Sequence, residues 1–338
     1  MFGWINDGLY AILNWIQSWS GAWGIAIILF TIMVRLALTP LDIKSRASMR
    51  KTTKLQPQLQ ALQKKYANDK EKLNAKTAEL YKKANVNTLS SCLPLLLTWP
   101  ILIAVFSAMR TVANKELLEQ VGQILNGQQP AMEQFLWIKN LWMPDNLFSA
   151  AYPDLGTLQQ ISSAEWIEWF SGLESMPALL KDLNLTTASF ENSQLRETVT
   201  AIQAAMAAGN ETYAHAIAVN GGWTFNLLIT TFSLPNVPNG LLLLPVLSAV
   251  SQIVMTKITG TGTQPSQGAN DQAASTGKFM NYFFPIFSLV ICLGYSSAVA
   301  LYWVAGNLVS MAQTIVINKV LDNKEKQAAA VAGEGTIK

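Results

Sequence analysis

Five apolar runs constrain the fold of this chain more than any other feature of its sequence. They lie near 21–41, 93–110, 225–257, 279–296 and 298–318. Each is close to the ~20 residues that cross the hydrocarbon core of a bilayer as a helix. Such runs must be helical, because lipid offers no hydrogen-bond partner to backbone groups. With 50% hydrophobic and only 13% charged residues, the sequence predicts an all-α polytopic membrane protein with five transmembrane helices.

Two segments of opposite charge indicate how these spans are oriented. Segment 42–92 has twelve Lys and Arg against four acidic residues, whereas segment 114–238 has four against twelve. Short loops rich in Lys and Arg stay in the cytoplasm, so segment 42–92 is expected there. The N-terminus then lies outside, and five crossings leave the C-terminus in the cytoplasm.

The apolar runs and the charge balance divide the chain into ten segments. These are an interfacial amphipathic helix at 1–20, a first span at 21–41, a basic cytoplasmic antiparallel helical hairpin at 42–92, a second span at 93–113, an acidic, mostly helical extracytoplasmic insertion at 114–238, a third span at 239–258, a flexible cytoplasmic loop at 259–278, a fourth span at 279–296, a fifth span at 297–318 and a cytoplasmic tail at 319–338. Pro57 is expected in the first turn of the first hairpin helix, and a polar break is expected at 67–71 between the two hairpin helices. A tight turn is expected at 294–297 between the last two spans, and the Ala-rich tail is expected to be disordered. In the insertion, Ser162 and Glu165 resemble a capping box, and a helix is predicted at 193–208.

Arg35 is the residue that most needs an explanation, because a charge inside a transmembrane helix is costly and is usually kept for function. About 8 Å of helix separates Arg35 from Pro40, so the side chain can also reach the cytoplasmic interface. The functional alternative is a water-filled cavity lined by Arg35 with Gln252, Asn307 and Gln313. Each of these three could instead be an ordinary hydrogen-bonding residue between helices, and Trp303 a plain packing residue.

The sequence gives little support to an enzyme. It contains no nucleotide-binding loop, no HExxH and no GxSxG motif, and its one histidine, His215, lies in the outer segment. Cys92 and Cys292 form no CxxC or Cys/His cluster, so no metal site, disulfide framework or small-molecule cofactor is expected.

The basic hairpin allows three interpretations. It could hold anionic lipid headgroups, bind ribosomal RNA or another acidic partner, or serve only as the orientation signal. The cations proposed for partner binding are Lys51, Lys54, Lys64, Lys65, Lys82 and Lys83.

Several motifs together resemble the YidC/Oxa/Alb family of membrane protein insertases, in a bacterial short form without the large periplasmic domain between a first extra span and the core. The resemblance covers about two thirds of the chain in the family's order. The motifs are Gly21-Ala22-Trp23-Gly24, Val34-Arg35-Leu36, Thr39-Pro40-Leu41, Leu55-Gln56-Pro57-Gln58-Leu59, Cys92-Leu93-Pro94-Leu95-Leu96, Phe135-Leu136-Trp137-Ile138 and Leu301-Tyr302-Trp303 through Asn307-Leu308-Val309. The long acidic segment 114–238 departs from the family's usual short connection.

The resemblance implies a membrane insertase and chaperone in a bacterial plasma membrane. Its hydrophilic groove would open to the cytoplasm and lipid, with Arg35 as its positive charge and Gln252, Trp303, Asn307 and Gln313 in its lining. Nascent membrane proteins would be its substrates, and the ribosome, the Sec translocon and anionic lipids its expected partners. A small-solute transporter or channel is the main rival, and a structural scaffold displaying the outer segment is a third interpretation.

Overall fold

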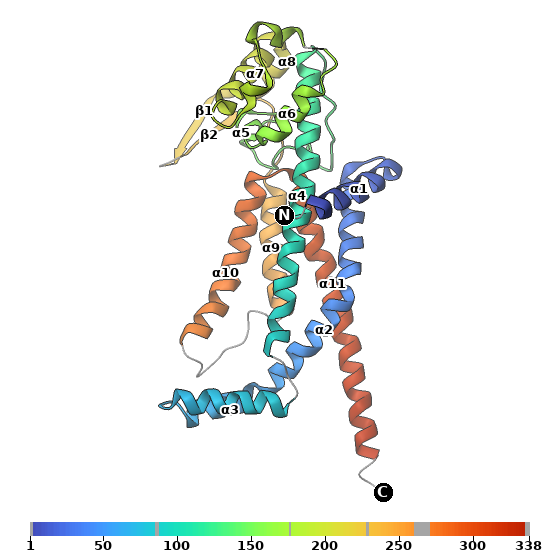
Figure 1. Cartoon of the computed structure of the whole chain (residues 1–338), viewed down its shortest axis with the longest axis vertical. Helices are drawn as coiled ribbons and strands as arrows, with labels where there is room; N and C mark the ends of the chain where they lie inside the picture. Colours follow the sequence, from blue (N-terminus) through green and yellow to red (C-terminus); the bar gives the residue numbers. More distant parts are fainter. Residues whose placement is uncertain (1–2, 85–87, 176, 228–229, 260–270, 335–338) are drawn as a thin grey trace. The chain divides into compact units, whose positions relative to one another are not determined.

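The computed structural model describes residues 3–84, 88–175, 177–227, 230–259 and 271–334, and the chain is mostly helical. It forms two compact units. The first comprises Met1–Phe30, Ala104–Ser248 and Ser288–Trp303, and the second comprises Thr31–Ile103, Ala249–Phe287 and Val304–Lys338. Four long helices, α2 (Trp23–Lys65), α4 (Thr88–Leu125), α10 (Asp271–Gly294) and α11 (Ser297–Glu334), contribute residues to both units, as does α9 (Leu243–Thr259) (Figure 1).

The first unit contains α1 and the outer segment. Besides its parts of the long helices, the elements of this unit are α1 (Gly3–Ser20), α5 (Leu155–Leu158), α6 (Ser163–Ser171), η1 (Ala178–Leu183), η2 (Thr187–Phe190), α7 (Leu195–Gly209), α8 (Glu211–Ile217), β1 (Val219–Leu227) and β2 (Thr230–Pro235). Large buried side chains such as Trp142, Trp166, Phe190 and Tyr213 form its core. The short helices pack on one another: α7 contacts α5, α8, η1 and η2, and α6 contacts η2 (Figure 1).

Two local predictions in the outer segment are confirmed. Ser162 and Glu165 form a capping box at the start of α6, with side chain and backbone bonded in both directions. Helix α7 ends at Gly209, one residue beyond the predicted end, and Asn210 then caps α8 through a hydrogen bond from the backbone N–H of Tyr213. Local capping chemistry is therefore sufficient to place these ends.

A buried polar network fastens the loop around residues 140–146 to the ends of three long helices. Asp145 is fully buried, and its carboxylate accepts hydrogen bonds from the backbone N–H groups of Leu241 (2.8 Å) and Leu244 (2.7 Å) at the start of α9. It also accepts one from the indole N–H of Trp137 (3.1 Å). Asp145 is thus an N-terminal cap supplied from a distant part of the chain.

The same loop reaches the turn between α10 and α11. Asn146 donates to the carbonyl oxygen of Leu293 (3.0 Å), and both the backbone N–H and the hydroxyl of Ser297 donate to the carbonyl oxygen of Met143. Helix α10 ends at Gly294 and α11 begins at Ser297, so the tight turn predicted at 294–297 is confirmed. These bonds satisfy backbone groups that a helix end would otherwise leave unpaired.

The outer segment also contains a two-stranded antiparallel sheet, which the sequence analysis did not predict. Phe225 pairs with Phe232 and Asn226 with Thr231, and the register shifts between Val219 and Thr224. The sequence analysis treated 225–257 as one apolar run that contains a membrane span, and it predicted no strand there. The first part of this run instead forms a hairpin, because Thr, Phe and Trp in alternation favour a strand as much as a helix.

The part of the second unit that was predicted to be a cytoplasmic hairpin differs from the prediction in two respects. Helix α2 continues without a break to Lys65, so Pro57 lies inside it and not in the first turn of a separate helix. Pro40 and Pro57 are both exposed, which lets water replace the hydrogen bonds that proline cannot donate, and α2 bends along this part (Figure 1). Helix α3 (Lys70–Lys83) follows a short turn that covers most of the predicted break at 67–71.

The predicted disorder of the tail is wrong, because α11 extends to Glu334. Its Ala-rich composition favours a helix once the preceding turns are formed. The predicted loop at 259–278 lies partly on residues 260–270, outside the described ones, and α10 already begins at Asp271.

Candidate functional site

The second unit brings Arg35 of α2 against Gly306 of α11. A Cβ atom on Gly306 would lie 3.2 Å from one terminal nitrogen of Arg35 and 3.7 Å from its Nε atom. The absence of a side chain at this position therefore makes room for the guanidinium. Arg35 is half-buried, which fits a charge held between helices better than one extended fully into water.

Gln313 ties α11 to the turn of α2 that precedes Pro40. Its side-chain amide donates to the carbonyl oxygen of Arg35 (3.0 Å) and to the hydroxyl of Thr39 (2.7 Å). The Thr39 hydroxyl also donates to the Arg35 carbonyl oxygen (3.1 Å). Proline at position 40 cannot donate to this turn, so polar side chains can approach its carbonyl groups.

Further polar groups continue along the same helices. Asn307 is buried and donates to the hydroxyl of Ser251 in α9 (2.9 Å), and Arg46 donates to the hydroxyl of Thr314 (2.6 Å). We call the set Arg35, Thr39, Arg46, Ser251, Asn307, Ser310, Gln313 and Thr314 the polar cluster.

Three atoms of the polar cluster are buried without a hydrogen-bond partner among the described residues. They are Nε of Arg46, Oγ of Ser310 and Oε1 of Gln313. Buried polar atoms are nearly always paired with protein or with water. Of these three residues, Gln313 also donates a hydrogen bond to the Arg35 carbonyl oxygen.

The structure brings two of the predicted groove residues into direct contact. Arg35 and Gln313 are in direct contact, and Asn307 follows Gly306, which packs on Arg35. Gln252 is half-buried in α9, and its carbonyl oxygen accepts a hydrogen bond from Thr256. Trp303 belongs to the first unit, where it packs edge to face against Phe106 with ring centroids 5.9 Å apart.

Asp42 is a member of this neighbourhood that the sequence analysis missed. It is half-buried, and the positive charges of both Arg35 and Arg46 act on its carboxylate. The spacing of seven residues from Arg35 and four to Arg46 places all three on one side of α2, which was the signal in the sequence. Arg35 is therefore not isolated from acidic groups.

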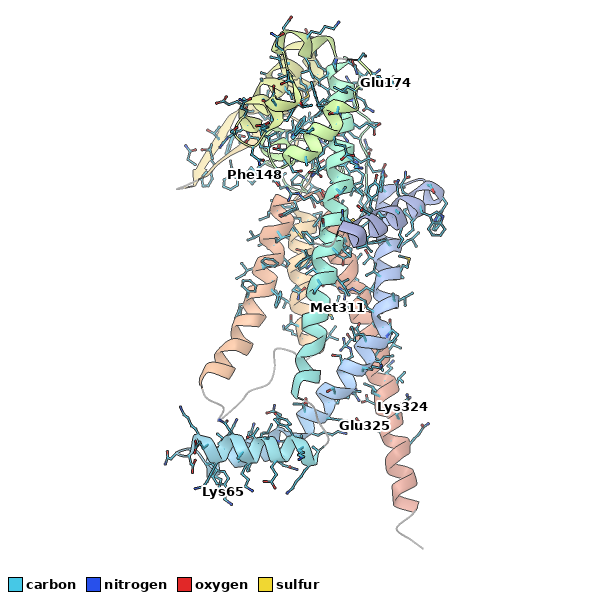
Figure 2. All side chains as sticks on the ribbon, in the orientation of Figure 1. Lys65, Phe148, Glu174, Met311, Lys324 and Glu325 are labelled. Carbon is cyan, nitrogen blue, oxygen red and sulfur yellow. The ribbon has the colours of Figure 1, made fainter. Side chains whose placement is uncertain are left out.

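The six predicted partner-binding lysines are all exposed on α2 and α3. Figure 2 shows Lys65 near the turn that joins these helices, and its ammonium group lies 5.6 Å from the ring centroid of Tyr66. Lys83 pairs with Glu79 of its own helix (2.9 Å), and hydrogen bonds from Lys76 and Lys83, reinforced by their charges, lower the pKa of Glu79 to about 2. The remaining exposed cations give this surface a positive potential.

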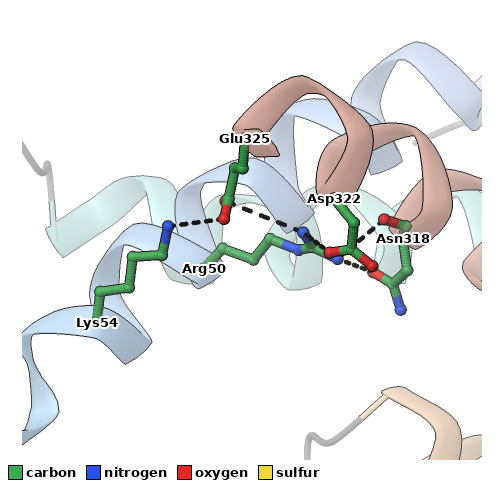
Figure 3. Close-up of polar contacts among 5 residues, drawn as sticks. All are labelled: Arg50, Lys54, Asn318, Asp322 and Glu325. Carbon is green, nitrogen blue, oxygen red and sulfur yellow. Dashed lines mark hydrogen bonds and ion pairs between the residues drawn. The ribbon is translucent and has the colours of Figure 1, made fainter. Parts of the chain in front are cut away.

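The C-terminal part of α11 neutralises part of the basic surface of α2 (Figure 3). Arg50 pairs with Asp322 (2.6 Å) and donates to both the carbonyl and the side-chain oxygen of Asn318, and Lys54 pairs with Glu325 (2.8 Å). Residues 46, 50 and 54 form one stripe of α2, and residues 318, 322 and 325 form one stripe of α11. The sequence analysis missed this pairing because the two stripes are far apart in the chain.

Acidic groups cluster at the outer part of α4. Burial, reinforced by the negative charges of Glu119 and Glu133, raises the pKa of Glu116 to about 7. Glu133 itself accepts a hydrogen bond from the backbone N–H of Trp23 at the start of α2 (2.9 Å). This carboxylate therefore stabilises the N-terminus of that helix.

Long apolar helices with a cationic polar cluster between them define a polytopic helical membrane protein. Among the described residues, Trp23–Lys65 and Ser297–Gln327 are long and apolar enough to cross a bilayer, and Leu243–Ile258 and Tyr282–Gly294 are shorter apolar helices. The sequence profile of the family described as 60Kd inner membrane protein matches residues 15–325, so the chain belongs to this family, the YidC/Oxa1 family.

Curated relatives carry the name membrane protein insertase YidC. The protein of Chlorobaculum parvum is 26% identical over 320 residues, which are 95% of this chain and 37% of that protein. The protein of Fusobacterium nucleatum is 39% identical over 40% of this chain and 58% of its own length, and that of Anaeromyxobacter dehalogenans strain 2CP-C is 39% identical over 42% and 23%. The chain thus spans about a quarter to under two thirds of the length of these relatives.

Proposed function

We propose that this protein is a non-enzymatic membrane protein insertase and chaperone. It receives hydrophobic segments of nascent membrane proteins in a hydrophilic groove open to the cytoplasm and releases them into the bilayer, alone or with the Sec translocon. The observation that carries the proposal is the polar cluster, in which half-buried Arg35 packs on Gly306 and its carbonyl oxygen accepts a hydrogen bond from Gln313, whose Oε1 atom is buried with no partner among the described residues. Family membership and the names of the relatives support it.

In this mechanism the polar cluster lowers the cost of bringing polar residues of a substrate into the membrane. A substrate carboxylate or backbone carbonyl would accept hydrogen bonds from Arg35, and a hydrogen bond to a charged group is worth about 1.5–3 kcal/mol. The apolar helix of the substrate then moves into lipid, where each Leu, Ile, Phe or Val contributes roughly 0.3–0.6 kcal/mol. No nucleotide is needed, because this partition drives insertion.

The proposed arrangement in the cell follows the charge balance. The protein would lie in a bacterial plasma membrane with five spans, its N-terminus outside and its C-terminus in the cytoplasm. The exposed lysines of α2 and α3 would meet the ribosome or anionic lipid headgroups, since both present phosphate groups. The Sec translocon would be a partner for larger substrates.

The test is insertion of a single-spanning substrate into vesicles from cells depleted of their own insertase. Wild type should insert the substrate, Arg35→Lys should retain part of the activity, and Arg35→Ala should lose roughly tenfold or more, the value of one charge-assisted hydrogen bond. Lys44→Ala is the matched control, because Lys44 is an exposed cation of the same helix outside the polar cluster. Equal insertion by wild type and Arg35→Ala would assign Arg35 a structural role, and failure of wild type would favour a small-solute transporter or channel.

A further inference from the structure

The β1–β2 hairpin has two chemically different faces. Side chains alternate across a strand, and paired residues of neighbouring strands share a face. The paired residues Phe225 and Phe232 therefore lie on one side. Trp223 precedes Phe225 by two residues in β1 and shares this side by alternation, and we call the side the aromatic face. The opposite side carries Thr224, Asn226, Thr231 and Ser233, and here the Thr231 hydroxyl donates to the Asn226 side chain (2.6 Å).

The aromatic face is exposed in the chain by itself. Trp223 is 73% and Phe225 is 59% exposed. Phe148 covers only the Phe232 side, with ring centroids 5.1 Å apart, and Figure 2 shows Phe148 near the hairpin. A two-stranded sheet is at best marginally stable in water, so an exposed aromatic face indicates that something covers it.

The charge pattern identifies what covers it. Between Glu211 and Lys257 the sequence contains no Asp, Glu, Lys or Arg. A protein interface normally has a polar rim with charges that fix register, and this surface offers none. The interfacial region of a bilayer binds a surface that has an apolar face and amphipathic aromatic residues at the edge of that face. Trp is the preferred aromatic residue at this position.

The apolar surface also continues directly into a membrane helix. The chain runs from β2 into α9, where Leu241, Leu243, Val246 and Leu247 are all exposed. Within the first unit the hairpin slopes away from α7 and α8 toward the level of α1 and the start of α9 (Figure 1). Helix α1 exposes Trp15 and Trp19, the same kind of interfacial residue.

We propose that the β1–β2 hairpin is an amphipathic membrane anchor that lies in the outer interface of the bilayer, with its aromatic face toward the acyl chains and its hydroxyl and amide face toward water. The anchor would hold the acidic outer segment against the membrane on the side of α9. The proposal rests on the membrane location of the protein and not on insertion activity, so the two can fail separately.

The test uses single cysteines carrying an environment-sensitive fluorophore. In a background of Cys92→Ala and Cys292→Ala, the variants Trp223→Cys, Thr224→Cys, Phe225→Cys and Asn226→Cys of the full chain are labelled. They are reconstituted in vesicles of phosphatidylethanolamine and phosphatidylglycerol, with and without lipids spin-labelled near the headgroup. We expect a blue shift and a loss of fluorescence to the spin-labelled lipid at 223 and 225, and quenching by aqueous iodide at 224 and 226.

The alternation provides its own control, because the pairs 223/224 and 225/226 each compare one site on the aromatic face with one on the opposite face. Each site is labelled in a separate variant, so a substitution that disturbs the strand in one variant does not affect the other pair. Equal iodide quenching at all four sites would overturn the anchor and place the hairpin in water. Protection of 223 and 225 from both quenchers would also overturn it, since a protein surface would then cover the aromatic face. Neither readout depends on insertion of a substrate.

Discussion

Asp145→Ala should destabilise the outer end of α9 strongly, because this carboxylate replaces the hydrogen bonds that a helix N-terminus lacks. It accepts from the backbone N–H groups of Leu241 and Leu244 and from the indole of Trp137. Hydrogen bonds to charged groups contribute about 1.5–3 kcal/mol each, and loss of an N-cap costs about 0.5–2 kcal/mol. Allowing for partial hydration of Leu241, we expect a loss of about 3–4 kcal/mol, which for a chain of this size lowers the Tm by roughly 6–8 °C.

Gly240 supplies a second way to test the same contact. A Cβ atom on Gly240 would overlap the Oδ1 atom of Asp145, so Gly240→Ala should displace the carboxylate without removing it. Both variants should therefore lower the Tm, whereas Asp182→Ala, which removes an exposed carboxylate of the outer segment, should leave it unchanged. Asp145→Asn should fall between wild type and Asp145→Ala, because an amide offers one acceptor oxygen in place of two.

The assay is thermal unfolding in detergent with a thiol-reactive dye. Cys292 is fully buried in the same unit as Asp145, so it reacts only when that unit opens. A Cys92→Ala background makes Cys292 the single reporting thiol. If Asp145→Ala melts within about a degree of wild type, the carboxylate does not hold the start of α9 and the energetic argument is wrong.

Three further predictions concern charge and packing. The raised pKa of Glu116 means that folding favours its protonated form, so the free energy of unfolding should fall by about 1 kcal/mol, after allowance for its partial exposure, as pH rises from about 4.5 to about 7. Glu116→Gln should flatten the curve of Tm against pH. An unchanged slope would show that Glu116 does not cause this pH dependence. The double variant Asp322→Asn, Glu325→Gln should change the Tm little, since exposed ion pairs contribute about 0.2–1 kcal/mol each. It should nevertheless broaden the distribution of distances between spin labels on α2 and on the end of α11, and high salt should have the same effect on the wild type. Gly306→Leu should displace the guanidinium of Arg35 and reduce insertion as Arg35→Ala does, while full activity would show that Arg35 acts elsewhere.

The features that sequence reasoning anticipated are those fixed within a few residues of the chain. The capping box at Ser162, the end of α7 and the turn after Gly294 depend on local hydrogen bonds and on composition, so they could be predicted. Arg35 was identifiable because a charge in an apolar run is rare. The groove lining, the five spans and the partner-binding lysines remain predictions.

The features that were missed depend on long-range contacts or on balanced propensities. No local pattern couples Asp145 to the start of α9 or Arg50 to Asp322, because the partners lie about a hundred residues or more apart. The continuity of α2 through Pro57 depends on exposure of that proline, which a helical pattern alone does not reveal. The β1–β2 hairpin was hidden because its apolar residues could extend a membrane run as well as form a strand.

The uninterrupted course of α2 joins the basic surface around Lys64 and Lys65 to Arg35 through a single helix. From Arg35 to Lys65 the helical path is about 45 Å long at 1.5 Å per residue, and it contains both Pro40 and Pro57. Its compliance is concentrated at Pro40 and Pro57, where the backbone lacks a hydrogen bond. Motion of the Lys64–Lys65 end is therefore expected to be absorbed first by bending at these two prolines, and only the remainder would reach Arg35.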